Sequence, residues 1–436
     1  MRALLFEAFM FLALPVSLVF PHLGVLIYYW ISYMAPQQLL WVAAGVPWGK
    51  LVVATILIAI PFVKTKQKFP LTFVTVSLIA FFLWCTLTTT DAIYRNICWG
   101  LWTDFAKVIA MCLLTIVLMG TRERLQALIW VIVISLGFYT VKGGIFVLLT
   151  AGSYHVLGPA NSPFTETNGF ARAALMLVPL MYFLSLHSAR RYVRVGLRVA
   201  IALTLLALMG TGSRGGFIGL AAALLVFFAY SRHKARLMIS GIVLLVLLIA
   251  IIPQQRLEDW TGRMSTIDHF EEVTTAQDRF KAWHYAMDMA AAHPVLGGGF
   301  GSFAGNTGIV ANPDVALDAH SNYFQVLGDQ GYIGLVLYLL LGLAVLLSQR
   351  RTYRLTRSRP DLYWARDLAV LLQVDAIGYF VGGLTVNHPY IELYYSLIAL
   401  TVLSAAMVKR ALAEPPMALA TALSGPAMAT PSEFRP

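Results

Sequence analysis

Charged residues are scarce in this chain. Only 12% of its 436 residues are charged, whereas 59% are hydrophobic and the mean hydropathy is +0.73. Because a soluble domain has roughly 25% charged residues, this shortage excludes a soluble globular protein. It predicts an all-α polytopic membrane protein, with room for about 12 transmembrane helices of roughly 20 residues each.

Cysteines and internal repeats are also scarce. The three cysteines, Cys85, Cys98 and Cys112, lie in apolar stretches without metal-ligand or disulfide spacing, so we interpret them as packing residues. No internal repeat is visible, although many transporters are built from repeats. These absences disfavour a disulfide framework and a transporter.

What the chain does have is a series of apolar runs separated by basic turns such as "KTKQK" (64–68), "SRHKAR" (231–236) and "QRRTYRLTRSR" (349–359). If the basic turns all face the cytoplasm, every second connection does so without conflict, and the C-terminus is cytoplasmic too. The same rule accounts for the net charge of +11 without nucleic acid. The apolar runs lie near 3–34, 49–63, 70–90, 98–119, 125–150, 168–187, 196–211, 215–230, 236–252, 321–348, 367–386 and 390–408.

Two parts of this topology need comment. Residues 1–34 form either one span or two short helices divided at "PHLG" (21–24). On the face opposite the basic turns, which we call the outer face, the segment 253–320 is too long for a simple connection. Within it, 276–294 has the spacing of an amphipathic helix ended by proline, and 295–308 is rich in glycine.

The chain therefore divides into four parts. These are an N-terminal transmembrane bundle (1–252), an outer-face loop domain that contains helices (253–320), C-terminal transmembrane helices (321–410) and a disordered tail rich in proline and alanine (411–436).

Cations gather on the outer face against the usual trend. They are Lys142, Arg172, Arg214, Arg263 and Arg279. Lys142 and Arg172 lie inside apolar runs, where a charge marks a functional cavity or an ion pair, and Glu166 is a possible partner for Arg172. Arg214, in the glycine-built turn "GTGSRGG" (210–216), either snorkels or clamps a diphosphate. Arg263 and Arg279 either face solvent or join the others around a polyanionic ligand.

A histidine opens the apolar run that follows the long loop, in "DAHSNYFQVLGDQG" (318–331). His320 is either a helix cap or the proton acceptor of an active site, since histidine accepts a proton near neutral pH. Asp318 is placed to orient its imidazole, and Asn322 lies nearby on the same helix start. A base beside phosphate-binding arginines points to group transfer from a diphosphate.

Several blocks resemble the signature blocks of the O-antigen ligase and polymerase superfamily. They are "SRGGFIG" (213–219), "DRFKAWHYAMDMAAAHPVLGGGFGSF" (278–303) and "HSNYFQVLGDQGYIGL" (320–335). "NSPFTETNGFARA" (161–173) resembles an Asn-rich block of that superfamily. "PHLGVLIYYWISYMAPQQLLW" (21–41) is similar to its O-glycosylation ligase subgroup. In total the resemblance covers nearly the whole chain.

The resemblance implies a GT-C-like enzyme of the bacterial inner membrane with a periplasmic active site, which makes 253–320 a periplasmic loop. Its donor would be a glycan on undecaprenyl diphosphate. A ligase would transfer this glycan to lipid A-core oligosaccharide, or in relatives to a protein, whereas a polymerase would extend another lipid-linked glycan. The N-terminal block favours a ligase. The alternatives from other classes are a transporter or flippase and a structural subunit of an export complex.

The resemblance also assigns residues. Arg214, Arg279 and His320 match the essential arginines and histidine, whereas Asp329 stands where the family commonly has glutamate and receives no catalytic role. The block around 166–168 is less acidic or less rich in asparagine than is usual in the family, which weakens any assignment to Glu166 and Asn168.

The mechanism we expect needs no metal and no cofactor, because the outer face has no acidic pair of the DxD type. Arg214 and Arg279 would bind the two phosphates, with Arg263 or Lys142 in support, and His320 would take the acceptor proton during an inverting attack. The remaining predicted substrate-binding residues are Arg172, Asn322 and Asn168.

Overall fold

The computed structural model describes residues 2–39, 46–63, 66–159, 162, 164–230, 274–303 and 319–413. Over these residues the chain is built from helices and irregular connections, without a β-strand. This confirms the all-α prediction. It is also what a membrane imposes, since a helix satisfies its backbone hydrogen bonds within one segment.

The helices follow the predicted apolar runs closely. In chain order they are α1 (Arg2–Val19), α2 (Pro21–Met34), α3 (Pro36–Leu39), α4 (Trp48–Ala59), α5 (Phe73–Thr90), α6 (Arg95–Leu118), α7 (Arg122–Leu149), α8 (Thr167–His187), α9 (Arg191–Gly210), α10 (Arg214–Tyr230), α13 (Thr274–Ala292), α15 (Asn322–Thr356), α16 (Tyr363–Gly382) and α17 (Glu392–Ala413). Short 3-10 turns occupy Ile60–Phe62 and Pro360–Leu362.

Seven of the described helices are long and apolar enough to cross a membrane: α5, α6, α7, α8, α9, α15 and α17. Three shorter apolar helices lie at 3–19, 48–62 and 214–230. The chain is therefore a multi-pass membrane protein. The expected total of about 12 spans stays a prediction, because the run at 236–252 lies outside the described residues.

Residues 2–34 form two helices rather than one span. The division falls at Pro21, which occupies the first turn of α2, where its missing N–H group costs no hydrogen bond. Both helices pack against α4.

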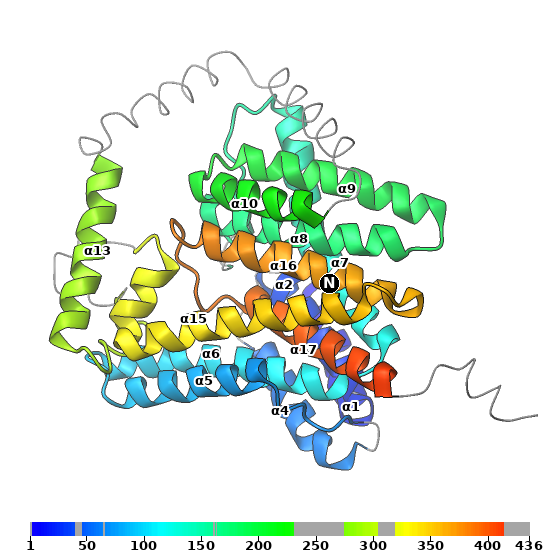
Figure 1. Cartoon of the computed structure of the whole chain (residues 1–436), viewed down its shortest axis with the longest axis horizontal. Helices are drawn as coiled ribbons and strands as arrows, with labels where there is room; N and C mark the ends of the chain where they lie inside the picture. The colour runs from blue at the N-terminus through cyan, green and yellow to red at the C-terminus, as the bar shows by residue number, and fades with distance from the viewer. Residues whose placement is uncertain are drawn as a thin grey trace, which may run out of the picture.

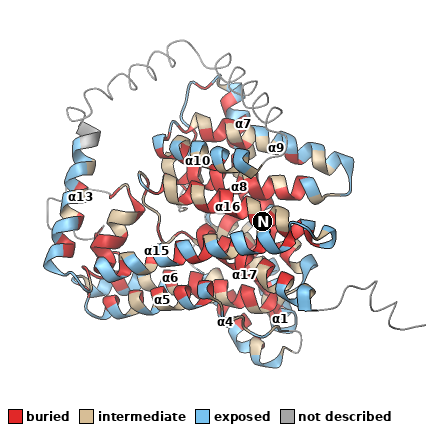
Figure 2. Ribbon diagram, viewed as in Figure 1, coloured by how far each residue is buried: buried red, intermediate tan, exposed pale blue. Residues whose placement is uncertain are grey.

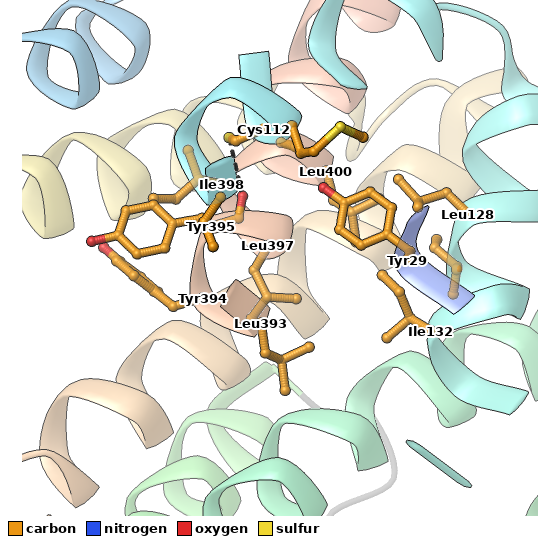
Figure 3. Close-up of a cluster of buried hydrophobic side chains, with 14 of the residues drawn as sticks. Tyr29, Cys112, Leu128, Ile132, Leu393, Tyr394, Tyr395, Leu397, Ile398 and Leu400 are labelled. Atoms are coloured by element: carbon orange, nitrogen blue, oxygen red, sulfur yellow. Dashed lines mark hydrogen bonds between the residues drawn. The ribbon is translucent and has the colours of Figure 1, made fainter. Parts of the chain in front are cut away.

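The interior of the bundle is centred on α8, α16 and α17, whereas α9 keeps much of its surface exposed (Figure 2). Around α17, side chains from α2, α6 and α7 close the core (Figure 3). There the thiol of Cys112 donates to the carbonyl oxygen of Tyr395 at 3.2 Å. All three cysteines are free and buried, as packing residues are.

The long helix α15 is kinked. Gly331 interrupts it with φ of +67°, a conformation that glycine adopts without strain. The glycine-rich turn after α13 packs on this kink, since the N–H of Gly298 donates to Gly328 O at 2.8 Å and that of Gly299 to Asp329 O at 2.9 Å. Figure 1 shows α13 at one edge of the molecule, beyond the start of α15.

Candidate active site

The helix starts that carry the unusual polar residues meet at one end of the bundle. They are the N-terminal ends of α8, α10 and α15, joined by the connection between α16 and α17. The N–H of Asn322, at the start of α15, donates to Gly383 O at 2.8 Å. A Cβ on Gly215, at the start of α10, would lie 2.5 Å from atoms of Thr385 and Val386, so the "SRGG" turn reaches this connection only because the residue is glycine.

Ser213 fixes the turn that presents Arg214. Its hydroxyl oxygen accepts the N–H of Gly216 at 3.2 Å, which caps α10. The same hydroxyl donates to Asn168 Oδ1 at 2.6 Å, which ties α10 to the first turn of α8. Arg214 is the first residue of α10 and its side chain is exposed, so the guanidinium lies beside the positive end of the helix dipole. This geometry offers an anion both a cation and backbone N–H groups.

Arg172 is buried within the bundle, with only 3% of its surface exposed. One guanidinium nitrogen donates to Asn322 Oδ1 at 3.1 Å, and another donates to the carbonyl oxygen of Val386 at 2.7 Å. The guanidinium also lies 5.2 Å from the centre of the Tyr379 ring. Glu166, the partner considered from the sequence, is exposed, and no described carboxylate pairs with Arg172. The buried positive charge is therefore not neutralised by the described part of the protein.

Asn322 is the junction of this network. It is fully buried, and its Oδ1 accepts from Arg172 and also from the backbone N–H of His388 at 2.7 Å. Its amide nitrogen donates to Tyr338 OH at 3.2 Å. The side chain thus links α8, α15 and the connection between α16 and α17, and its hydrogen-bonding capacity is used by the protein itself.

His320 lies two residues before α15 in an unusual backbone conformation, with φ of +43°. Such a conformation is unfavourable for a residue with a Cβ and persists where the surroundings impose it. One constraint comes from α13, where the indole N–H of Trp283 donates to Ala319 O at 2.9 Å. The Trp283 ring also stacks on Phe324, with centroids 4.8 Å apart. Contacts on both sides of His320 therefore hold it at the start of the helix.

His388 belongs to the same site, although our sequence analysis singled out no residue of its connection. Burial lowers the pKa of His388 to about 3, with smaller contributions from the charge of Arg172 and from the His320 imidazole. Arg172 and the backbone N–H of His388 donate to the same oxygen of Asn322, which follows His320 by two residues, so His388 belongs to this group. A histidine in a short outer-face connection was the available signal, but its proximity to His320 arises only from tertiary packing.

Asp329 has a structural position. It is fully buried, and its carboxylate accepts the N–H of Phe303 at 2.9 Å and the hydroxyl of Tyr390 at 3.2 Å. It therefore joins the glycine-rich turn to the connection that carries His388.

Two family models match the chain. Residues 199–339 match the family described as O-antigen ligase, and residues 1–189 match a family of unknown function, DUF5935. The match at residues 199–339 supports membership of the O-antigen ligase and polymerase superfamily. The superfamily resemblance is thereby confirmed, and the match supports a ligase or polymerase type of function. No curated protein matches the chain.

The O-antigen ligase segment supplies only part of the site. Arg214, Arg279, His320 and Asn322 lie within it, whereas Arg172 and Asn168 come from the DUF5935 segment and His388 lies after both. The site is therefore assembled from both matched segments and from the residues that follow them.

The other predicted residues are less closely tied to this group. Arg279 is half-buried on α13, about one turn before Trp283. Lys142 is exposed on α7, and no hydrogen bond or ion pair joins it to the other cations among the described residues. Arg263 and Asp318 lie outside the described residues. In the same described part, no three His, Cys, Asp or Glu side chains gather as metal ligands, and metal independence stays a prediction.

Proposed function

We propose that the protein is an O-antigen ligase-type glycosyltransferase of the bacterial inner membrane. It would move a glycan from undecaprenyl diphosphate to a hydroxyl of lipid A-core oligosaccharide at the periplasmic face. The observation that supports this most is the convergence of the "SRGG" turn, the buried Arg172 and His320 at one end of the bundle, with the turn and the histidine both inside the O-antigen ligase segment.

The phosphates would bind where cations and helix N–H groups coincide. Arg214 and Arg279 would hold the diphosphate, with Lys142 and Arg263 as further candidates. Two guanidinium nitrogens of Arg172 already donate hydrogen bonds to the protein, so we assign this residue a role other than the predicted direct binding of the substrate. Its unneutralised charge would raise the positive potential of the site, which favours a bound anion without direct contact.

These positions support the following reaction. The acceptor hydroxyl attacks the anomeric carbon, its proton passes to His320, and the bond to the diphosphate breaks with its electron pair leaving on the phosphate oxygen. Attack from the face opposite the leaving group inverts the linkage. The arginines stabilise the charge that develops on the diphosphate, and a neutral His320 accepts the proton.

An O-antigen polymerase or a protein O-glycosylation ligase is the alternative. Each would use the same donor and the same arginines, so the acceptor decides between them. Purified protein in detergent would be given undecaprenyl-diphosphate glycan in EDTA, with lipid A-core, with a protein acceptor or with neither. Glycosylated lipid A-core supports the ligase, whereas longer lipid-linked glycans without an added acceptor support the polymerase.

The role of Arg214 has its own test in that assay. Arg214→Ala should lower turnover by about 10²–10³-fold, because it removes a cation from the developing charge. Arg351→Ala is the matched control, since Arg351 is an exposed arginine near the far end of α15. Unchanged turnover of Arg214→Ala would sink the diphosphate clamp.

A further inference from the structure

His388 carries an unused hydrogen-bonding atom. Its Nδ1 is buried and has no hydrogen-bond partner among the described residues. Buried polar atoms are nearly always paired, because an unpaired one loses its contact with water and gains nothing in return. In the neighbouring side chains Arg172 and Asn322, by contrast, the polar groups are engaged in bonds to the protein.

The position of His388 is fixed by hydrogen bonds of its backbone rather than of its imidazole ring. The N–H of His388 donates to Asn322 at 2.7 Å, and the carbonyl oxygen of His388 accepts the hydroxyl of Tyr379 at 3.1 Å. Two residues earlier, Arg172 donates to Val386 O. Side chains from α8, α15 and α16 thus fix the connection on both sides of His388, and Pro389 restricts its backbone further.

His388 and His320 have different roles because the His388 ring is too weak a base to accept a proton at pH 7. Because burial and the nearby charge of Arg172 keep the pKa of His388 at about 3, its ring is neutral at pH 7 and is a weak base. A neutral imidazole offers one N–H group and one lone pair, so it can hydrogen-bond without adding charge. His388 therefore suits binding, and the proton of the acceptor is left to His320.

We propose that His388 is a substrate-contacting residue whose Nδ1 hydrogen-bonds a sugar hydroxyl of the glycan substrates. This assignment rests on the proposed function. A hydroxyl fits better than a phosphate oxygen because it both donates and accepts, so it pairs with Nδ1 in either tautomer, whereas an ionised phosphate oxygen only accepts. A site built to bond a substrate hydroxyl also discriminates strongly against substrates that lack it.

The test compares His388→Asn with His388→Leu in the full-length protein. Asparagine retains a polar atom near the position of Nδ1, and leucine does not. We expect His388→Leu to lower kcat/KM for glycan transfer by about 10- to 100-fold and His388→Asn to stay within about threefold of the wild type. His284→Leu is the control and should be unchanged, since His284 is exposed and its Nδ1 already bonds Phe280 O at 2.9 Å.

Thermal unfolding in detergent excludes a merely structural effect. Removing an unpaired buried polar atom should leave the unfolding temperature of His388→Leu equal to or above that of the wild type. A fall in unfolding temperature in parallel with activity, or equal losses in the leucine and asparagine variants, would overturn the assignment to Nδ1.

The source of the hydroxyl is read from the two Michaelis constants. If His388→Leu raises the KM for the undecaprenyl-diphosphate glycan at saturating lipid A-core, the hydroxyl belongs to the donor. If it raises the KM for lipid A-core at saturating donor, the hydroxyl belongs to the acceptor. If the wild type transfers the glycan and His388→Leu has the same kcat/KM, only the role of His388 is overturned. A wild-type protein that neither transfers nor binds the lipid-linked glycan overturns the proposed function, and with it the ligand assigned to His388.

Discussion

At the scale of single residues, the site is unusual in enclosing a cation that no described carboxylate neutralises. Arg172 is buried against Asn322, Val386 and the Tyr379 ring, and no described carboxylate balances it. An uncompensated buried charge is costly unless a ligand supplies the opposite charge. A diphosphate bound at the nearby start of α10 would do so, which gives Arg172 a reason to be in the bundle.

This account predicts that charge alone cannot replace the guanidinium. Arg172→Lys keeps the positive charge, but a single ammonium cannot reproduce the two separate guanidinium bonds to Asn322 and Val386. We expect a loss of about 1–3 kcal/mol in unfolding free energy and a fall in turnover of at least about tenfold. Denaturant unfolding and the transfer assay measure both, and a lysine variant that matches the wild type in both would refute the role.

The sequence marked individual residues but not the contacts between them. A charge inside an apolar run marked Arg172, and proximity to His320 marked Asn322. Both were predicted to bind the substrate, whereas in the structure they hydrogen-bond each other. His388 was missed because a short connection between two helices gives no pattern, and its place in the site depends on Asn322 lying beside it. The sequence shows which residues can bind an anion or accept a proton, whereas their hydrogen-bond partners depend on tertiary contacts.

At the scale of elements, the kink in α15 connects the glycine-rich turn to the site. Gly331 has φ of +67°, and a Cβ there would lie 2.5 Å from the carbonyl oxygen of Val295. Asp329 bonds Phe303 from the turn and Tyr390 from the connection that carries His388. The kink therefore sets where α13 and the connection lie relative to His320.

Gly331→Ala should consequently destabilise the protein. The positive φ and the contact with backbone atoms, which cannot move aside, predict a loss of about 1–3 kcal/mol. Gly100→Ala is the matched control, because a Cβ on this helical glycine meets nothing within 4 Å, and we expect a gain of about 0.5–1 kcal/mol. Equal unfolding free energies for the two variants would show that the kink is not required.

The positions of the helices along the chain were the most predictable feature. The runs expected at 168–187 and 215–230 became α8 (Thr167–His187) and α10 (Arg214–Tyr230), because lipid imposes helix wherever a long apolar run occurs. The kink in α15 was not predicted, since the "GDQG" segment (328–331) reads as part of a continuous helix until the turn that packs on it is known.

At the scale of the whole molecule, the two ends of the bundle differ chemically. One end carries the candidate site. The other carries the basic turns, where Arg122 lies 5.3 Å from the Trp364 ring and Arg359 pairs with Asp361 at 2.9 Å. This asymmetry is the basis for placing the site in the periplasm.

The orientation can be tested with introduced cysteines, because the three native thiols are buried and give little background. Ser153→Cys, in the exposed connection after α7, should react with a membrane-impermeant maleimide added from the periplasmic side. Arg190→Cys, exposed before α9, should react only after the membrane is opened. The opposite labelling pattern would invert the proposed topology.

The central claim is that this end of the bundle transfers a glycan from a polyprenyl diphosphate. The most direct measurement is mass spectrometry of lipid A-core after incubation with purified protein, EDTA and undecaprenyl-diphosphate glycan. The account predicts lipid A-core heavier by one glycan, one undecaprenyl diphosphate released for each, and neither product with His320→Ala. An unmodified acceptor and intact donor with folded wild-type protein, whether the acceptor is lipid A-core, a protein or a second lipid-linked glycan, would contradict it.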